Sequence, residues 1–357
     1  MPDIYINYGT NLPEITYELM KAAGIADRLE PGMTVGIKPN LVVSRPAEGG
    51  ATTHPGIVEG IIRYVQDAGV RSVSILEGSW VGDSTQRAFR SCGYTALAER
   101  YGAALIDTKQ DRVVTRASKG LSLSLCESAL RVDYLINVPV LKGHCQTGMT
   151  CCLKNLKGCI PDNEKRKFHS QGLHKPIAAL NTVLRPALHI VDSVCGDLSF
   201  EEGGNPVEAN RVLLGFDPVL LDSYGAQLMG YQPDDIDYLR IAREYGIGKY
   251  AGSDTEIAEL NAHNRPKTGG PRNAAVKNLS RYIEADSACS ACYAALVFAL
   301  DKTGGLRGER IKIGQGFQGK TLKGLGAGNC TAGCERYVKG CPPKASDIVE
   351  VLGRAGR

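Results

Sequence analysis

Short apolar runs alternate with longer amphipathic segments over the first third of the chain. Residues 34–43, 72–77 and 103–107 have the length and the β-branched content of strands, while 54–68 and 85–100 space their apolar residues as helices do. A segment of this length is what a crossover between parallel strands requires. The pattern predicts an α/β fold with a mostly parallel sheet flanked by helices.

Further apolar runs continue this pattern to about residue 230. Additional strands that can extend the sheet are predicted at residues 121–125, 134–140, 188–191 and 212–215, and helices at 218–229 and 233–251. The proline and glycine density of residues 264–271 indicates a linker or an exposed loop. We therefore expect an α/β body at 1–280 and a small C-terminal α/β module at 281–357.

The composition is that of a soluble globular protein, with 43% apolar and 22% charged residues. The net charge of +4 is small and its basic residues are interleaved with acidic ones, so no nucleic-acid partner is expected. No apolar stretch is long enough to span a membrane, and the amino terminus lacks the features of a secretory signal. These features predict a cytoplasmic protein with no membrane partner, and they are compatible with a homo-oligomer.

Twelve cysteines in a reducing compartment indicate metal ligation or catalysis instead of disulfides. Cys289 and Cys292 lie three residues apart where an apolar helix begins, so both can face one site. The positive end of the helix dipole would also stabilise thiolates or a thiolate-ligated cluster.

Three more cysteines follow in glycine-rich loops at positions 330, 334 and 341, and the last precedes two prolines. Glycine allows close approach to cluster sulfurs, and a ligand cysteine followed by proline is a recurring iron–sulfur arrangement. We expect the ligands of a [4Fe–4S] cluster to be Cys289, Cys292, Cys330 and Cys341, with Cys334 as the alternate to Cys330. A structural zinc site and a set of inert buried thiols are the competing interpretations.

A basic segment leaves a predicted strand at its carboxyl end, which is where open α/β sheets bind ligands. Lys142 and His144 end that strand, and Lys154 and Asn155 fall in 148–158, which is long enough for about three helical turns. Together these four residues would suit a carboxylate or phosphate, and His144 could move protons near neutral pH. We assign them as candidate catalytic residues, although each could equally be a packed or solvated side chain.

Further polar residues could line the same cleft. The predicted substrate-binding residues are Lys38, Asn40, Lys157, His169 and Asp192, and the turn 77–79 could also contribute. The alternatives are an ordinary turn at Lys38 and a helix cap at Asp192. A second metal site at Cys145, Cys151, Cys152 and Cys159 is not favoured, because adjacent cysteines on a helix would point to different faces.

Several motifs together resemble the domain-of-unknown-function 362 family. They are residues 36–41, 53–55, 137–144, 153–158 and 190–192, and the C-terminal cysteines resemble the tail of an iron–sulfur branch of that family. The tail lacks the consecutive Cys-x-x-Cys runs of other branches, which argues against a two-cluster relay. The resemblance implies a shared α/β body and a cluster, and it implies no particular reaction.

These observations lead to the hypothesis of an oxygen-sensitive enzyme of anaerobic metabolism. One [4Fe–4S] cluster would act by redox or Lewis-acid chemistry, as in an oxidoreductase or a lyase, on a small anionic metabolite. The alternative is a single-cluster electron carrier or redox sensor without its own substrate. Either could exchange electrons with an electron-transfer protein, and a zinc-stapled binding module is a third interpretation.

Overall fold

The computed structural model describes residues 1–265, 279–305 and 310–355. The body contains an eight-stranded sheet in the order β12-β1-β11-β10-β7-β2-β3-β4. Its strands are β1 (Ile4–Tyr8), β2 (Thr34–Pro39), β3 (Ser72–Glu77), β4 (Ala104–Asp107), β7 (Tyr134–Val138), β10 (Leu188–Ser193), β11 (Arg211–Gly215) and β12 (Ile257–Glu259). From β10 to β4 all neighbours are parallel, whereas β11 is antiparallel to β1 and β10. The predicted mostly parallel α/β fold is confirmed.

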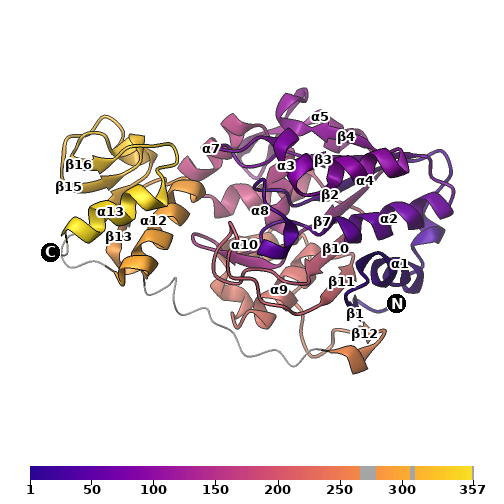
Figure 1. Ribbon diagram of the computed structural model, residues 1–357. Helices are drawn as coiled ribbons and strands as arrows, with labels where there is room; N and C mark the ends of the chain where they lie inside the picture. Colours follow the sequence, from indigo (N-terminus) through magenta and orange to yellow (C-terminus); the bar gives the residue numbers. More distant parts are fainter. Residues whose placement is uncertain (266–278, 306–309, 356–357) are drawn as a thin grey trace.

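Helices cover both faces of this sheet (Figure 1). One apolar core includes residues of α1 (Leu12–Ala22), α2 (Pro55–Asp67), α3 (Thr85–Ser91) and α4 (Tyr94–Tyr101). The other includes residues of α5 (Glu127–Arg131), α6 (Cys152–Asn155), α7 (Asp162–Ser170), α8 (His174–Val183), α9 (Pro218–Leu228) and α10 (Asp237–Glu244). Strands β7 and β10 are buried along their whole length, which explains their continuous apolar runs.

Some predicted elements differ from the observed ones. Residues 121–125 do not join the large sheet, because β6 (Leu121–Cys126) pairs with β5 (Val113–Ser118) in a separate hairpin. The helix expected at 85–100 is divided at Gly93, whose φ of 81° no helix accommodates. The helix expected at 148–158 is observed only in part. Its start is wrong, since β9 (Gly148–Thr150) pairs with β8 (Lys142–His144), and helical structure begins with the short α6 and continues as a 3-10 helix at Leu156–Cys159. Most of the expected linker, from residue 266 onward, lies outside the described residues.

The C-terminal part has its own parallel sheet and apolar core. Strands β13 (Ile283–Ala285), β14 (Ile311–Ile313), β15 (Leu322–Ala327) and β16 (Cys334–Val338) form the sheet, with helices α12 (Ser290–Thr303) and α13 (Ala345–Ala355). Figure 1 shows this module beside the end of the body that carries α7. The Phe200 and Phe298 rings meet edge to face at 6.2 Å, and the Gln146 amide donates to the Ala288 carbonyl at 2.8 Å.

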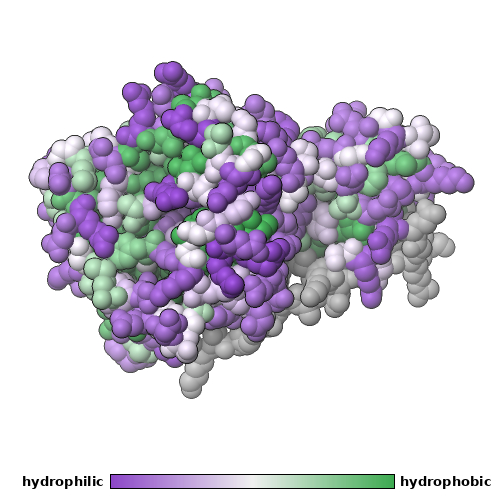
Figure 2. Space-filling model, turned by 180° about the vertical axis from the view of Figure 1, so that it is seen from behind, coloured by the Kyte–Doolittle hydropathy of each residue, from purple (hydrophilic) through white to green (hydrophobic). Residues whose placement is uncertain are grey.

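Polar side chains cover much of the face seen in Figure 2, on the body and on the module alike. Among the residues that the structure describes, no helix combines the length and the apolar character needed to cross a membrane.

Candidate functional site

One pocket is lined by residues of both the body and the C-terminal module. It lies beyond the carboxyl ends of β2 and β3, the edge at which open α/β sheets bind ligands. Most residues predicted for the cleft line it, namely Lys38, Asn40, Lys142, His144, Lys154, Asn155, Lys157 and His169. From the module, Cys289, Cys292, Cys341 and Pro342 line the same pocket.

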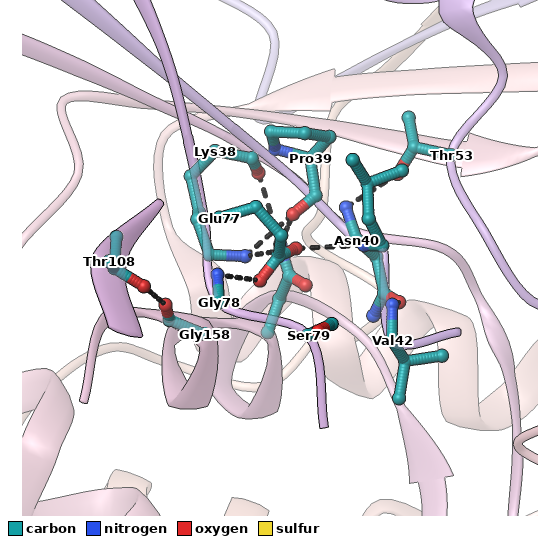
Figure 3. A network of polar contacts seen from close by, with 12 residues as sticks. Lys38, Pro39, Asn40, Val42, Thr53, Glu77, Gly78, Ser79, Thr108 and Gly158 are labelled. Atoms are coloured by element: carbon teal, nitrogen blue, oxygen red, sulfur yellow. Dashed lines mark hydrogen bonds and ion pairs between the residues drawn. The ribbon is translucent and has the colours of Figure 1, made fainter. Parts of the chain in front are cut away.

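A buried ion pair contributes to the lining of the pocket, and Figure 3 shows its polar contacts. The Lys38 ammonium lies 2.8 Å from the Glu77 carboxylate, and both side chains are at most 3% exposed. The same carboxylate accepts hydrogen bonds from the backbone N–H groups of Leu41 and Gly78. Gly158 packs so closely that a Cβ atom there would lie 2.2 Å from a Glu77 oxygen. Through this ion pair, Lys38 holds the carboxyl ends of β2 and β3 together.

Lys142 and His144 are held by a loop residue, Glu201. The Lys142 ammonium donates to the backbone carbonyls of Ala51 and Glu201 at 2.5 and 2.8 Å, and burial lowers its pKa to about 8. The His144 Nδ1 atom accepts backbone N–H bonds from Gln146 and Thr147, so the ring proton resides on Nε2 and is donated to the Glu201 carboxylate.

Both nitrogens of His144 are thus occupied, and burial lowers the pKa of the ring to about 4. This arrangement differs from the predicted proton-moving role near neutral pH. The imidazole is neutral there and orients Glu201. Burial acts to raise the pKa of Glu201, but its interaction with the His144 ring, which donates a hydrogen bond to it, and the charge of Lys154 outweigh burial and hold this pKa below its usual range.

Two lysines of the segment 154–157 face the pocket. Lys154 donates to the Thr150 hydroxyl at 2.9 Å and lies 4.0 Å from Glu201. Within the described residues, Lys157 has neither a hydrogen bond nor an ion pair for its ammonium. Burial, followed by repulsion from Lys154, lowers the pKa of Lys157 to about 7. An anion entering the pocket would supply the partner that Lys157 lacks.

Helix α7 adds further polar groups to the pocket. The His169 Nδ1 atom is buried without a hydrogen-bond partner in the described structure, and burial together with Lys157 lowers the pKa of the ring. Arg166 and Lys165 line the pocket from the same helix. Together with Lys38, Lys142, Lys154 and Lys157, these two residues bring the number of cationic side chains in the lining to six. The lining contains only two carboxylates, Glu77 and Glu201.

Two predicted residues have structural partners. The Asn155 amide donates to the Lys38 carbonyl and the Asn137 side chain, which ties α6 to β2 and β7. Asp192 lies away from the pocket lining, and its carboxylate accepts hydrogen bonds from the backbone and ring nitrogens of His54.

The four cysteines predicted as ligands lie close enough to influence one another electrostatically. After burial, the charges of Cys330 and Cys341 raise the pKa of Cys289, and the other three cysteines raise that of Cys292. Cys334 acts differently, because the charges that affect its pKa are Lys312, Glu284 and Glu335. Its sulfur faces Gly326 on the neighbouring strand β15.

The spacing of these sulfurs is wider than that of ligands on one ion. No three of them lie within 4.8 Å of one another, all four being among the described residues. Thiolates on a single tetrahedral zinc would be about 3.8 Å apart, given a Zn–S distance of about 2.3 Å.

A known family model matches the part of the chain that forms the body side of the pocket, and it does not extend to the module side. The family model described as domain of unknown function (DUF362) matches residues 35–227. The chain belongs to the DUF362 family. The matched DUF362 segment includes the lysines, His144, His169 and Glu201, whereas the four module cysteines fall beyond its end.

Other comparisons accompany the DUF362 match. A thylakoid-associated protein of Synechocystis sp. is 24% identical over 258 residues, which cover 69% of this chain and 78% of that protein. The lactate racemase apoprotein from Thermoanaerobacterium thermosaccharolyticum aligns with a TM-score of 0.40 and 15% identity over 58% of this chain and 53% of its own. A Thermotoga maritima protein aligns with a TM-score of 0.40 and 13% identity, over 67% and 60%. The DUF362 chain thus spans less than two thirds of each solved chain.

A second group of ligand atoms lies inside the DUF362 segment, at Cys151, Cys152 and Asp222. The expectation that adjacent cysteines point apart is wrong here, because Cys151 precedes α6 with extended backbone and the two sulfurs are 3.9 Å apart. Asp222 already accepts the backbone N–H bonds of Cys152 and Leu153. The group could hold a metal, and these hydrogen bonds also explain it as a buried cap of α6.

Substitution Asp222→Asn is expected to change how stability depends on pH. Burial raises the pKa of Asp222 from 3.8 to about 7, so the folded state holds a proton that the unfolded state loses first. Wild-type stability should therefore fall as pH rises from about 4 to 7, by at most about 1.4 kcal/mol per pH unit from this group. Urea unfolding at several pH values would measure this. The variant should lack that part of the slope, and an identical slope in both proteins would contradict the assignment.

Some site residues were not predicted from the sequence. Glu201 and Arg166 carry no local motif, and the only tryptophan, Trp80, follows a strand as many aromatic residues do. Glu77 was expected only as part of a turn that could line the cleft. A signal that could have found it is its position at the carboxyl end of β3, next to that of β2.

Proposed function

We propose that residues 281–357 form an iron–sulfur module in which Cys289, Cys292, Cys330 and Cys341 hold one [4Fe–4S] cluster. We further propose that the protein is an enzyme acting on a small carboxylate or phosphate in the adjoining basic pocket. The observation that carries both ideas is the shared pocket, which has thiols on its module side and unpaired cationic groups on its body side.

The residues present fit such a cluster. Thiolates are its usual ligands, and the irons of a cubane occupy separate corners, so its sulfurs stand farther apart than those on one zinc ion. Cys289 caps the start of α12, whose first-turn N–H groups favour negative charge. At Gly328 a Cβ atom would lie 3.7 Å from the Cys292 sulfur, so backbone runs close beside this ligand.

The body side fits a small anion. Lys157 and the His169 Nδ1 atom lack partners among the described residues, while Arg166 adds a further cation at the rim. The cavity measures about 150 Å³, close to the volume that holds a benzene-sized molecule in a protein core. A charge-assisted hydrogen bond from Lys157 would orient the substrate, and the neutral His144 would keep Glu201 fixed beside Lys154.

A bound cluster would supply one-electron redox chemistry, since four thiolates occupy all four iron positions. A Lewis-acid role would require one of these cysteines to release its iron. An anion bound by the body side would lie against the cysteine side of the pocket, so substrate and cysteines would share one small space.

Substitution Lys157→Met tests the anion-binding half of the proposal. Inorganic phosphate and malonate serve as probes, with calorimetry and the fluorescence of the single Trp80 as readouts on anaerobically purified protein. Loss of one charged hydrogen bond is worth about 1.5–3 kcal/mol, so affinity should fall roughly 10- to 100-fold. Lys167→Met is the matched control, because Lys167 pairs with Glu164 on α7 and lies outside the pocket lining.

The outcomes separate the two functions. Iron present with phosphate or malonate binding that depends on Lys157 supports the enzyme. Iron present without anion binding would favour the electron carrier or redox sensor, and protein without iron after anaerobic purification would overturn both.

A further inference from the structure

A cysteine, a histidine and a carboxylate are aligned at a second place on the same sheet edge. The Cys195 sulfur lies 3.7 Å from His54 Nε2 and 3.4 Å from the Ala47 carbonyl oxygen, and His54 Nδ1 lies 2.9 Å from an Asp192 oxygen. His54 caps the start of α2, Asp192 belongs to β10, and Cys195 lies in the loop that follows β10. Neither Cys195 nor His54 lines the basic pocket.

Hydrogen bonds fix the orientation of the histidine. One Asp192 oxygen accepts both the backbone N–H and the ring Nδ1–H of His54, and the other accepts the Val194 N–H. The ring proton is therefore on Nδ1, which leaves Nε2 to take the thiol proton of Cys195. A nucleophile, a base and a group that orients the base thus lie next to one another in space, which is the arrangement that activates cysteine nucleophiles.

Burial supports the formation of an ion pair. Asp192 is 1% exposed and supplies the negative charge that an imidazolium needs in a buried position. Burial lowers the pKa of His54, but its hydrogen bonds to Asp192 and Cys195 outweigh burial and raise the pKa to about 10. Cys195 is 7% exposed and the His54 side chain 12%, and this limited exposure favours small reagents over bulky substrates.

We propose that Cys195, His54 and Asp192 form a second reactive centre, in which the Cys195 thiolate attacks small electrophiles of the hydroperoxide class. The sulfur donates an electron pair to one peroxide oxygen and the O–O bond breaks. The released alkoxide, or hydroxide when the reagent is hydrogen peroxide, takes the proton of the His54 imidazolium and leaves as an alcohol or as water. Cysteine is thereby oxidised by two electrons to sulfenic acid, and the peroxide is reduced.

Cys92 provides an internal control of similar burial. It is 4% exposed, and its thiol contacts the Arg45 carbonyl at 3.0 Å and the Thr52 hydroxyl. Both cysteines thus contact a backbone carbonyl of the segment 45–47, but among the described contacts only Cys195 has a histidine beside its sulfur. Burial raises the pKa of the Cys92 thiol to about 11. The two cysteines fall in separate tryptic peptides, residues 91–100 and 168–211, each with one cysteine.

The test compares the two cysteines within one protein. Full-length chain is treated with hydrogen peroxide and dimedone, or with iodoacetamide, and labelling is followed by peptide mass spectrometry. Cys195 should react about tenfold faster than Cys92 or more, because only a few per cent of an ordinary thiol is thiolate at neutral pH.

Substitution His54→Asn separates chemistry from structure. The asparagine amide can still donate to Asp192 and cap α2, but it offers no base to the sulfur. The Cys195 to Cys92 rate ratio should fall to near one while the melting temperature changes little. Equal rates for the two cysteines in the wild type, or an unchanged ratio in a folded variant, would overturn the proposal. The wild-type ratio decides the matter if the variant does not fold.

Discussion

Substitution Cys330→Ser should leave anaerobically purified protein without iron, whereas Cys334→Ser should leave the iron content unchanged. Cys330 acts electrostatically on Cys289 and Cys292, and the charges around Cys334 belong to other residues. A [4Fe–4S] cluster depends on its thiolates, so the loss of one ligand removes or degrades it. Iron and sulfide analysis with the visible absorption spectrum measures the outcome.

The two substitutions are matched, because both sites are separated by only four positions and both exchange sulfur for oxygen. Circular dichroism would verify that each variant is folded. If iron were lost from Cys334→Ser and retained in Cys330→Ser, Cys334 would be the ligand and Cys330 the spare cysteine. Zinc in place of iron in the wild type would instead identify a structural metal site.

Substitution Glu77→Gln should lower the free energy of unfolding by about 3–5 kcal/mol, because it leaves the Lys38 charge buried without its partner. Gln can still accept one backbone N–H bond, so the larger part of the loss reports the charge. Urea unfolding monitored by circular dichroism measures the change. The exposed ion pair of Glu14 with Arg63 is the control, and Glu14→Gln should cost less than about 1 kcal/mol.

A second substitution makes this prediction sharper. In Lys38→Met combined with Glu77→Gln, both charges are absent, and part of the lost stability should return. The recovery is incomplete because Lys38 also donates to the Pro39 carbonyl. If the double variant were as unstable as the sum of both single variants, the ion pair would not be the cause.

The central strands could be predicted because their apolar runs are continuous, as buried parallel strands require. The strand at 121–126 could not be assigned to its sheet, because periodicity reports burial and not the identity of the partner strand. The prediction of a helix over the whole of 148–158 was not met for another reason. Its residues are compatible with a helix, but pairing of Gly148–Thr150 with Lys142–His144 takes precedence over local preference.

Site residues could be predicted where a local sequence pattern marks them. The lysines and His144 follow a strand end, and the cysteine spacing is visible in the sequence. Long-range partners were not visible, since Glu201 and His144 are far apart in the chain and His54 meets Asp192 across 138 positions. The role of a residue such as His144 depends on which nitrogen is protonated, and only its neighbours decide that.

The shared pocket also has a consequence for the order of synthesis. The lysine side is complete once the DUF362 segment has folded, but its module side is made last. Without the module, Lys154, Lys157 and Arg166 would be more open to water, which would screen their mutual repulsion. Docking of the module would add the cysteine side, so completion of the pocket would be a late event of biogenesis.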